Sequence, residues 1–152
     1  MIFERIAIVG AGLIGASVAL AAREAGAAGG ISIYDANESV RQRARSLGFG
    51  AVFDDPEAAA AEADLVLLCV PVGAMAAAMG SVAPALKSGA IVSDVGSVKG
   101  AVIDAVRKLT PAHTFLVPGH PLAGTEHSGP DAGFAALFKG RWQIITPLDD
   151  AR

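Results

Sequence analysis

The segment from Ala7 to Gly15 constrains the fold of this chain more than any other. It reads Ala-Ile-Val-Gly-Ala-Gly-Leu-Ile-Gly, so a short apolar run ends directly in three glycines with G-x-G-x-x-G spacing. The run suits a strand that is buried on both faces, and from Leu13 onward the apolar positions repeat with helical spacing. A strand that passes through a glycine turn into a helix is the arrangement that binds the diphosphate of a dinucleotide.

Each residue of the turn has its own expected task. Gly10 permits the tight turn, Gly12 leaves room between the backbone and a diphosphate, and Gly15 lets the helix pack closely on the strand. Leu13 and Ile14 begin the helix, whose free N–H groups and positive dipole end would face the anion. The spacing alone is a weak signal, and a purely structural tight turn is the alternative.

The next expected strand favours the nucleotide-binding interpretation. It covers residues 31–34 and ends in Asp35, 20 residues after Gly15, where the fingerprint places an acid that binds the hydroxyls of the adenosine ribose. A carboxylate at this position repels the 2′-phosphate of NADP. We therefore expect NAD as the cofactor.

Three arginines follow on the next expected helix, which Asn37 caps and Gly48 ends. Arg41, Arg43 and Arg45 could form a solvated helix face or bind a cofactor 2′-phosphate. We favour the solvated face, because Asp35 would repel that phosphate.

The rest of the chain alternates between apolar runs and helical patterns. Strands are expected at residues 51–53, 65–70, 90–93, 113–117 and 142–146, helices at 56–63, 72–86, 98–109 and 131–138, and a long polar loop at 118–130. This order predicts an α/β fold of the Rossmann type, a doubly wound and mostly parallel sheet with helices on both faces. Val70 and Pro71, where the strand at 65–70 ends, are assigned to the cofactor site.

Composition narrows the possible partners. A chain of 152 residues suits one domain, and its net charge of −3 gives no basic patch for nucleic acid or a membrane surface. Two uncharged stretches, 6–22 and 65–86, are interrupted by glycine or proline and do not read as membrane spans. The single cysteine, Cys69, fits a reducing cytoplasm and a small buried hydrophobe rather than a nucleophile. No metal site is expected.

Two loops at the carboxyl ends of later strands carry most of the reactive side chains. The first is Asp94–Lys99, with the sequence Asp-Val-Gly-Ser-Val-Lys. The second is Gly119–Gly129, whose eleven residues include two histidines, a glutamate, a threonine and a serine. Ligands of open α/β sheets bind at this edge, so both loops should face the nicotinamide end of a bound dinucleotide.

Together with the glycine fingerprint, these two loops resemble the prephenate/arogenate dehydrogenase family of tyrosine biosynthesis, from Arg5 to about Thr146. The family pattern in the second loop is Gly-His-Pro-x-Ala-Gly-x-Glu-x-Ser-Gly, which is quite specific. The resemblance implies an NAD-binding domain at residues 1–146 and, at 147–152, the start of a linker. The family continues into a helical domain that forms a homodimer and supplies an arginine for the substrate carboxylate, and that half is missing here.

The resemblance also assigns roles to residues. His120 is the expected proton acceptor for the ring hydroxyl of prephenate or arogenate, and Ser97 would hydrogen-bond that hydroxyl or His120, or else cap the following helix. Thr125 and Glu126 would line the substrate mouth, and Lys99 would help to steer an anionic substrate. His113 and His127 are expected to be structural or exposed.

The expected activity is NAD-dependent oxidative decarboxylation of prephenate, arogenate or both. Two alternatives remain at this point: another dehydrogenase of the β-hydroxyacid type, and a dinucleotide-binding module without turnover. The apolar content of 53% is high for a small free-standing domain and indicates a surface that docks the missing half. The chain by itself is therefore expected to bind NAD and to be nearly inert.

Overall fold

The fold is organised by a parallel sheet of six strands, seen in a computed structural model that describes residues 1–148. The strands run in the order β3-β2-β1-β4-β5-β6, and every neighbouring pair is parallel. They are β1 (Phe3–Val9), β2 (Ala28–Tyr34), β3 (Ala51–Val52), β4 (Leu65–Leu68), β5 (Ile91–Asp94) and β6 (Phe115–Leu116). The predicted Rossmann-type sheet is confirmed.

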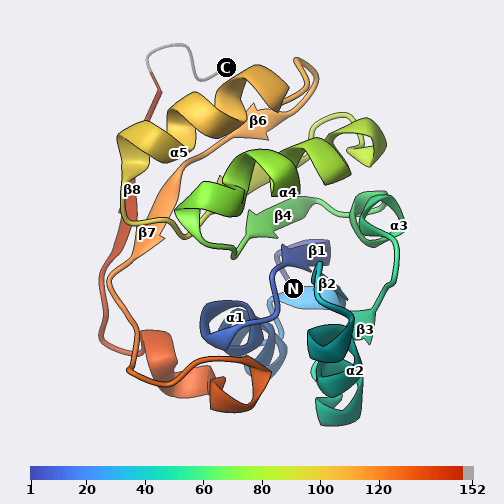
Figure 1. Cartoon of the computed structure of the whole chain (residues 1–152), viewed down its shortest axis with the longest axis vertical. Helices are drawn as coiled ribbons and strands as arrows, with labels where there is room; N and C mark the ends of the chain where they lie inside the picture. Colours follow the sequence, from blue (N-terminus) through green and yellow to red (C-terminus); the bar gives the residue numbers. More distant parts are fainter. Residues whose placement is uncertain (149–152) are drawn as a thin grey trace.

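Helices cover both faces of this sheet (Figure 1). Alternate residues of β1 point to opposite sides, as the strand period requires. Ile6 and Ile8 pack with α1 (Leu13–Glu24) and α2 (Glu38–Leu47). Ala7 and Val9 belong to the core on the other face, which is formed with α3 (Pro56–Ala60), α4 (Met75–Val82) and α5 (Lys99–Val106).

Two of the expected helices are shorter than predicted and end in tight turns. The segment at 72–86 consists of the 3₁₀ turns η1 (Val72–Ala74) and η2 (Ala83–Ala85) on either side of α4, and α5 passes into η3 (Arg107–Leu109). Pro84 lies in η2 and has no N–H to continue the α-helical ladder. The α-helices α4 and α5, of eight residues each, are therefore only about two turns long.

The predicted loop at 118–130 begins with a strand, which corrects the sequence interpretation. β7 (Gly119–Pro121) pairs antiparallel with β8 (Gln143–Ile145) and forms a two-stranded ribbon separate from the main sheet. His120 faces Ile144 across this ribbon. In Figure 1 the ribbon leaves the carboxyl edge of β5 and β6 and passes along the side of the molecule.

The helix predicted at 131–138 is also absent, replaced by two 3₁₀ turns, η4 (Pro130–Ala132) and η5 (Ala135–Phe138). Between them Gly133 touches α1 so closely that a Cβ atom on it would lie 2.5 Å from the Cβ of Ala16. The Phe134 N–H also donates to the Ser17 hydroxyl at 3.1 Å. A continuous helix would lift this backbone away from α1.

Within residues 1–148, none of the helices is both long and apolar enough to cross a membrane. The linker predicted at 147–152 falls mostly outside the described residues.

Candidate functional site

The three glycines of the turn occupy three different environments. Gly10 has a φ of +102°, and a Cβ on it would lie 2.4 Å from the Cys69 carbonyl oxygen. A Cβ on Gly15 would lie 2.0 Å from the Gly10 oxygen, whereas one on Gly12 would meet nothing within 4 Å. Gly10 and Gly15 are thus required by the packing, and Gly12 opens onto free space where a diphosphate would lie.

Asp35 lies beside this turn at the end of β2. One carboxylate oxygen accepts the Ala11 N–H at 2.8 Å, and the other accepts the Asn37 N–H at 2.9 Å. The carboxylate is therefore fixed against the glycine turn and is half-buried. Its place and orientation suit a partner for ribose hydroxyls.

A cleft of about 410 Å³ opens between the turn and α4. Its wall includes Gly10, Gly12, Asp35, Val70 and Pro71, all assigned to the cofactor site from the sequence. Leu13 and Ile14 are the first two residues of α1, and Gly12 caps that helix without a side chain. The first N–H groups of the helix are thus available to an anion.

Cys69, the residue after β4, also lines this cleft. Desolvation, and to a lesser extent the nearby Asp94 charge, raises the pKa of its thiol to about 12. A thiol that stays protonated is a poor nucleophile, which supports a packing role for this side chain.

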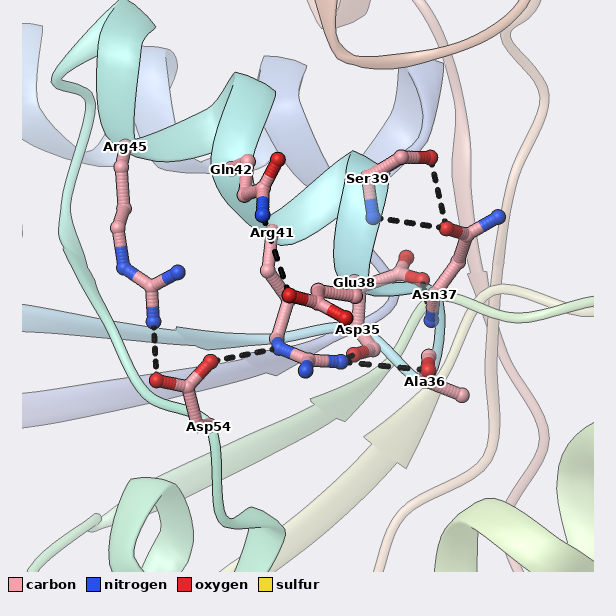
Figure 2. Close-up of polar contacts among 9 residues, drawn as sticks. All are labelled: Asp35, Ala36, Asn37, Glu38, Ser39, Arg41, Gln42, Arg45 and Asp54. Carbon is pink, nitrogen blue, oxygen red and sulfur yellow. Dashed lines mark hydrogen bonds and ion pairs between the residues drawn. The ribbon is translucent and has the colours of Figure 1, made fainter.

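The solvated face predicted for the arginines of α2 holds for Arg43 and Arg45, which are exposed, but is wrong for Arg41. Arg41 is only 13% exposed: it pairs with Asp54 at 2.9 Å and donates to the carbonyl oxygens of Asp35 and Ala36 (Figure 2). Arg45 pairs with the same Asp54 at 2.7 Å. Hydrogen bonds lower the pKa of the Asp54 carboxyl, the one from Arg45 more than the one from Arg41. Arg43 forms an ion pair with Asp131 of η4.

The first reactive loop is built on a buried ion pair. Asp94 is 2% exposed and pairs with the Lys99 ammonium. The other Asp94 oxygen accepts the Gly119 N–H at 3.2 Å, and the Lys99 ammonium donates to the Gly119 carbonyl oxygen at 2.5 Å. The pair therefore binds both the N–H and the carbonyl oxygen of Gly119, the residue before His120. These hydrogen bonds connect the two reactive loops.

This arrangement bears on the role predicted for Lys99. Its ammonium is committed to Asp94 and Gly119 and is 15% exposed, so steering of a substrate by Lys99 remains only a prediction. Asp94 was not singled out as a site residue from the sequence. A signal was present, since an acid at the end of a buried strand needs a partner and a lysine follows five residues later.

The other predicted site residues lie around the ribbon. His120 is half-buried in β7, and Ser97 is exposed in the turn before α5. Ser97 does not cap that helix, because the N-cap position is Val98. The alternative cap role proposed from the sequence is therefore wrong.

Thr125 and Glu126 are exposed, and both contact His127. Thr125 accepts the His127 N–H at 3.2 Å, and Glu126 lies 3.3 Å from the His127 imidazole. His113 contacts the Leu86 carbonyl oxygen at 2.9 Å, which agrees with a structural histidine. The Asp94–Lys99 pair thus holds the residue before His120, and Thr125 and Glu126 are open to solvent.

A second cleft, of about 500 Å³, lies along β6 and is lined by Arg107, residues 110–117 and Leu148. None of the predicted cofactor, catalytic or substrate residues lines it. The predicted cofactor residues line the other cleft, which is smaller, and His120 lines neither of the two.

Comparison with known proteins points to one family. Residues 18–152 match the model of the family described as prephenate dehydrogenase, nucleotide-binding domain. A cyclohexadienyl dehydrogenase of Zymomonas mobilis is 52% identical over 147 residues, which are 96% of this chain and 50% of that protein.

Solved structures agree. A prephenate dehydrogenase of Aquifex aeolicus, in complex with hydroxyphenyl propionate and NAD⁺, is 31% identical with a TM-score of 0.87 over 98% of this chain and 52% of that one. An arogenate dehydrogenase of Synechocystis is 29% identical with a TM-score of 0.85 over 95% of this chain and 50% of that one. The chain spans about half the length of these relatives.

Proposed function

Because this chain belongs to the family of prephenate dehydrogenase nucleotide-binding domains, we propose that it binds NAD⁺ and serves the oxidative decarboxylation of prephenate, arogenate or both. The observation that carries the proposal is the placement of two sites at one sheet edge. The glycine turn with Asp35 opens on a cleft of about 410 Å³. At the end of β5, which β4 separates from β1, the Asp94–Lys99 ion pair holds the backbone of Gly119, the residue before His120.

The residues around the cleft fit a dinucleotide. Gly12 leaves open space beside the free N–H groups of α1, where the diphosphate would bind. Asp35 would accept the adenosine ribose hydroxyls, and Val70 and Pro71 would form the opposite wall. NAD⁺, when bound, supplies the acceptor for a hydride.

His120 would act on the substrate. Prephenate and arogenate carry a hydroxyl on the ring carbon that loses hydride, and a carboxylate on the opposite ring carbon that leaves as CO₂. His120 would take the hydroxyl proton as the ring carbon loses hydride, and would return it to the same oxygen once loss of CO₂ makes the ring an aromatic phenol. Ser97 would orient the hydroxyl or the imidazole, and Thr125 and Glu126 would line the entrance.

The substrate side is expected to need a second domain. A dianionic substrate requires cations opposite its carboxylates, and Lys99 is already engaged by Asp94. Exposed apolar side chains surround the ribbon: Trp142 (79%), Val98 (57%), Ile145 (49%), Ile144 (45%), Leu122 (44%) and Phe134 (43%). We assign this surface to contact with the second half found in the relatives, through which the whole protein would form a homodimer in the cytoplasm.

Two measurements test this proposal. In calorimetry the chain should bind NAD⁺ more tightly than NADP⁺, and equal or tighter binding of NADP⁺ would contradict the proposal.

Turnover of prephenate and arogenate should appear when the chain is extended by the second half of its relatives, and be nearly absent without it. Turnover by the short chain within about tenfold of the extended one would show that the site is self-sufficient. An extended protein that binds NAD⁺ but turns over neither substrate would favour a non-catalytic module.

A further inference from the structure

Asp54 joins two arginines just behind the cofactor cleft. It follows β3, is 69% exposed, and each of its oxygens is taken by a different guanidinium of α2. Figure 2 shows Arg41 and Arg45 reaching Asp54 from the same side of the helix, because their positions differ by one helical turn.

Arg41 also lies against the turn that would receive the ribose. Its guanidinium donates to the carbonyl oxygens of Asp35 at 2.9 Å and of Ala36 at 3.2 Å. It lies 5.8 Å from the centre of the Tyr34 ring, and Tyr34, Asp35 and Ala36 all line the cleft. The Arg41 guanidinium therefore contacts the backbone of the segment that would lie beside a 2′-phosphate of the cofactor.

The acidic groups around Arg41 disfavour its binding to a cofactor 2′-phosphate. Asp54 directs the guanidinium toward β3, and Asp35 presents a carboxylate on the cleft side of the same turn. Glu38, also at this end of α2, is exposed and accepts a hydrogen bond from Gln42 at 3.1 Å. The arginines are thus neutralised by acids that a 2′-phosphate would have to replace.

We propose that Asp54 is a specificity-determining residue for the cofactor, which acts by holding Arg41 and Arg45 away from the 2′ position of the adenosine ribose. Rejection of a 2′-phosphate then has two parts. Asp35 repels it directly, and Asp54 withholds the two side chains that would bind it. This inference rests on the proposed binding of NAD⁺ and adds a residue outside the cleft to that site.

The test is a set of variants titrated with NAD⁺ and NADP⁺ by calorimetry on the full chain. Asp54→Ala should raise NADP⁺ affinity by about threefold to tenfold, as expected for one freed cation near a partly exposed phosphate, and leave NAD⁺ affinity within about twofold. Asp35→Ser should raise NADP⁺ affinity by about tenfold. The double variant should gain more than the product of the two, because the freed arginines then meet no competing carboxylate.

Asp131→Ala is the matched control. It removes the same charge and frees Arg43, which lies on the same helix but pairs with η4 and not with β3. Its ratio of NADP⁺ to NAD⁺ affinity should equal that of the parent. Adding Arg41→Gln to the double variant should remove most of the gain, and thermal unfolding of every variant shows that the comparison is made on folded protein.

The outcomes separate this inference from the function on which it rests. If the parent binds NAD⁺ but Asp54→Ala matches the Asp131→Ala control, or if the double variant gains only the product of the single changes, Asp54 has no such role. If Arg41→Gln leaves the gain intact, the same conclusion follows. A folded parent that binds neither nucleotide would overturn the proposed function and this inference with it.

Discussion

The glycine turn at 10–15 and the loop at 122–128 lie at the same end of the fold but differ in how they are held. The turn is packed so tightly that side chains at Gly10 or Gly15 would collide with backbone atoms, and Asp35 bonds directly to it. The loop is almost entirely exposed, and the contacts of Thr125 and Glu126 are to their neighbour His127. Folding of this chain therefore completes the cofactor side, whereas the substrate side depends on what covers the loop.

The largest expected effect concerns His120, which lies in β7 just before the exposed loop. In the chain extended by its second half, His120→Asn should lower kcat by about 10²- to 10⁴-fold, since asparagine cannot take the hydroxyl proton. Affinity for NAD⁺ should barely change, because His120 does not line the cofactor cleft. Steady-state kinetics with either substrate give the first value and calorimetry the second. A near-normal kcat would end the assignment of His120 as proton acceptor.

The next effect contrasts the buried pair with the exposed loop. Lys99→Met leaves Asp94, which is 2% exposed, without its cation, and removing one partner of a buried pair costs about 3–5 kcal/mol. Glu126→Gln, at an exposed position, should leave the unfolding free energy unchanged. Urea denaturation of both variants measures the difference. Equal stability of the two would mean that the Asp94–Lys99 pair does not hold the loops together.

A smaller effect separates packing from binding within the turn. Gly12→Ala places its methyl group in open space, so the chain should keep its stability while NAD⁺ affinity falls by about tenfold or more. Gly15→Ala should instead reduce stability, because the methyl group meets the Gly10 carbonyl oxygen. Thermal unfolding and calorimetry on the same samples distinguish the two. If Gly12→Ala binds NAD⁺ normally, the diphosphate does not pass over this residue.

The smallest effect comes from carboxylates that lie outside both regions, those of Asp64, Asp54 and Asp131. Hydrogen bonds from Lys87, and then from the backbone of Arg5, lower the pKa of Asp64, and arginines lower the pKa of Asp54 and Asp131. Because these folded-state pKa values lie below the unfolded ones, the stabilisation is complete above about pH 5 and is lost as the pH falls further, through the unfolded and then the folded pKa. Asp64→Asn should flatten the dependence of Tm on pH below about pH 5. An unchanged slope would exclude Asp64 as a contributor.

The sequence predicted the sheet and the cofactor site because both depend on local patterns. The apolar run at Ile6–Val9, the glycine spacing and Asp35 lie within one strand–helix–strand unit, and each carries a recognisable physical requirement. The ribbon was missed because Gly-His-Pro shows no alternation, and its partner strand begins 22 residues after it ends. Similarly, no local pattern shows that Gly133 must touch Ala16, which is why the predicted helix at 131–138 was wrong.

The site was predicted unevenly for the same reason. His120 and the loop residues were assigned through the family resemblance and stay predictions, whereas the contacts that hold Gly119 beside His120 were not predicted. The grip of Asp94 and Lys99 on Gly119 depends on the strand order at the edge of the sheet, which brings residues 20 to 25 positions apart into contact. The withdrawal of Arg41 from solvent was missed because its partner, Asp54, follows β3 and lies 13 positions further along the chain.

Trp142 is the single tryptophan of the chain, and it lies just before β8, where 79% of its surface faces solvent. Its backbone carbonyl accepts the Leu122 N–H at 2.8 Å, so the indole is anchored at the end of the ribbon that carries His120. Indole emission moves to shorter wavelength when water is excluded from the ring. The protein thus contains its own optical reporter: a blue shift on addition of a separately produced second half would reveal docking without any label.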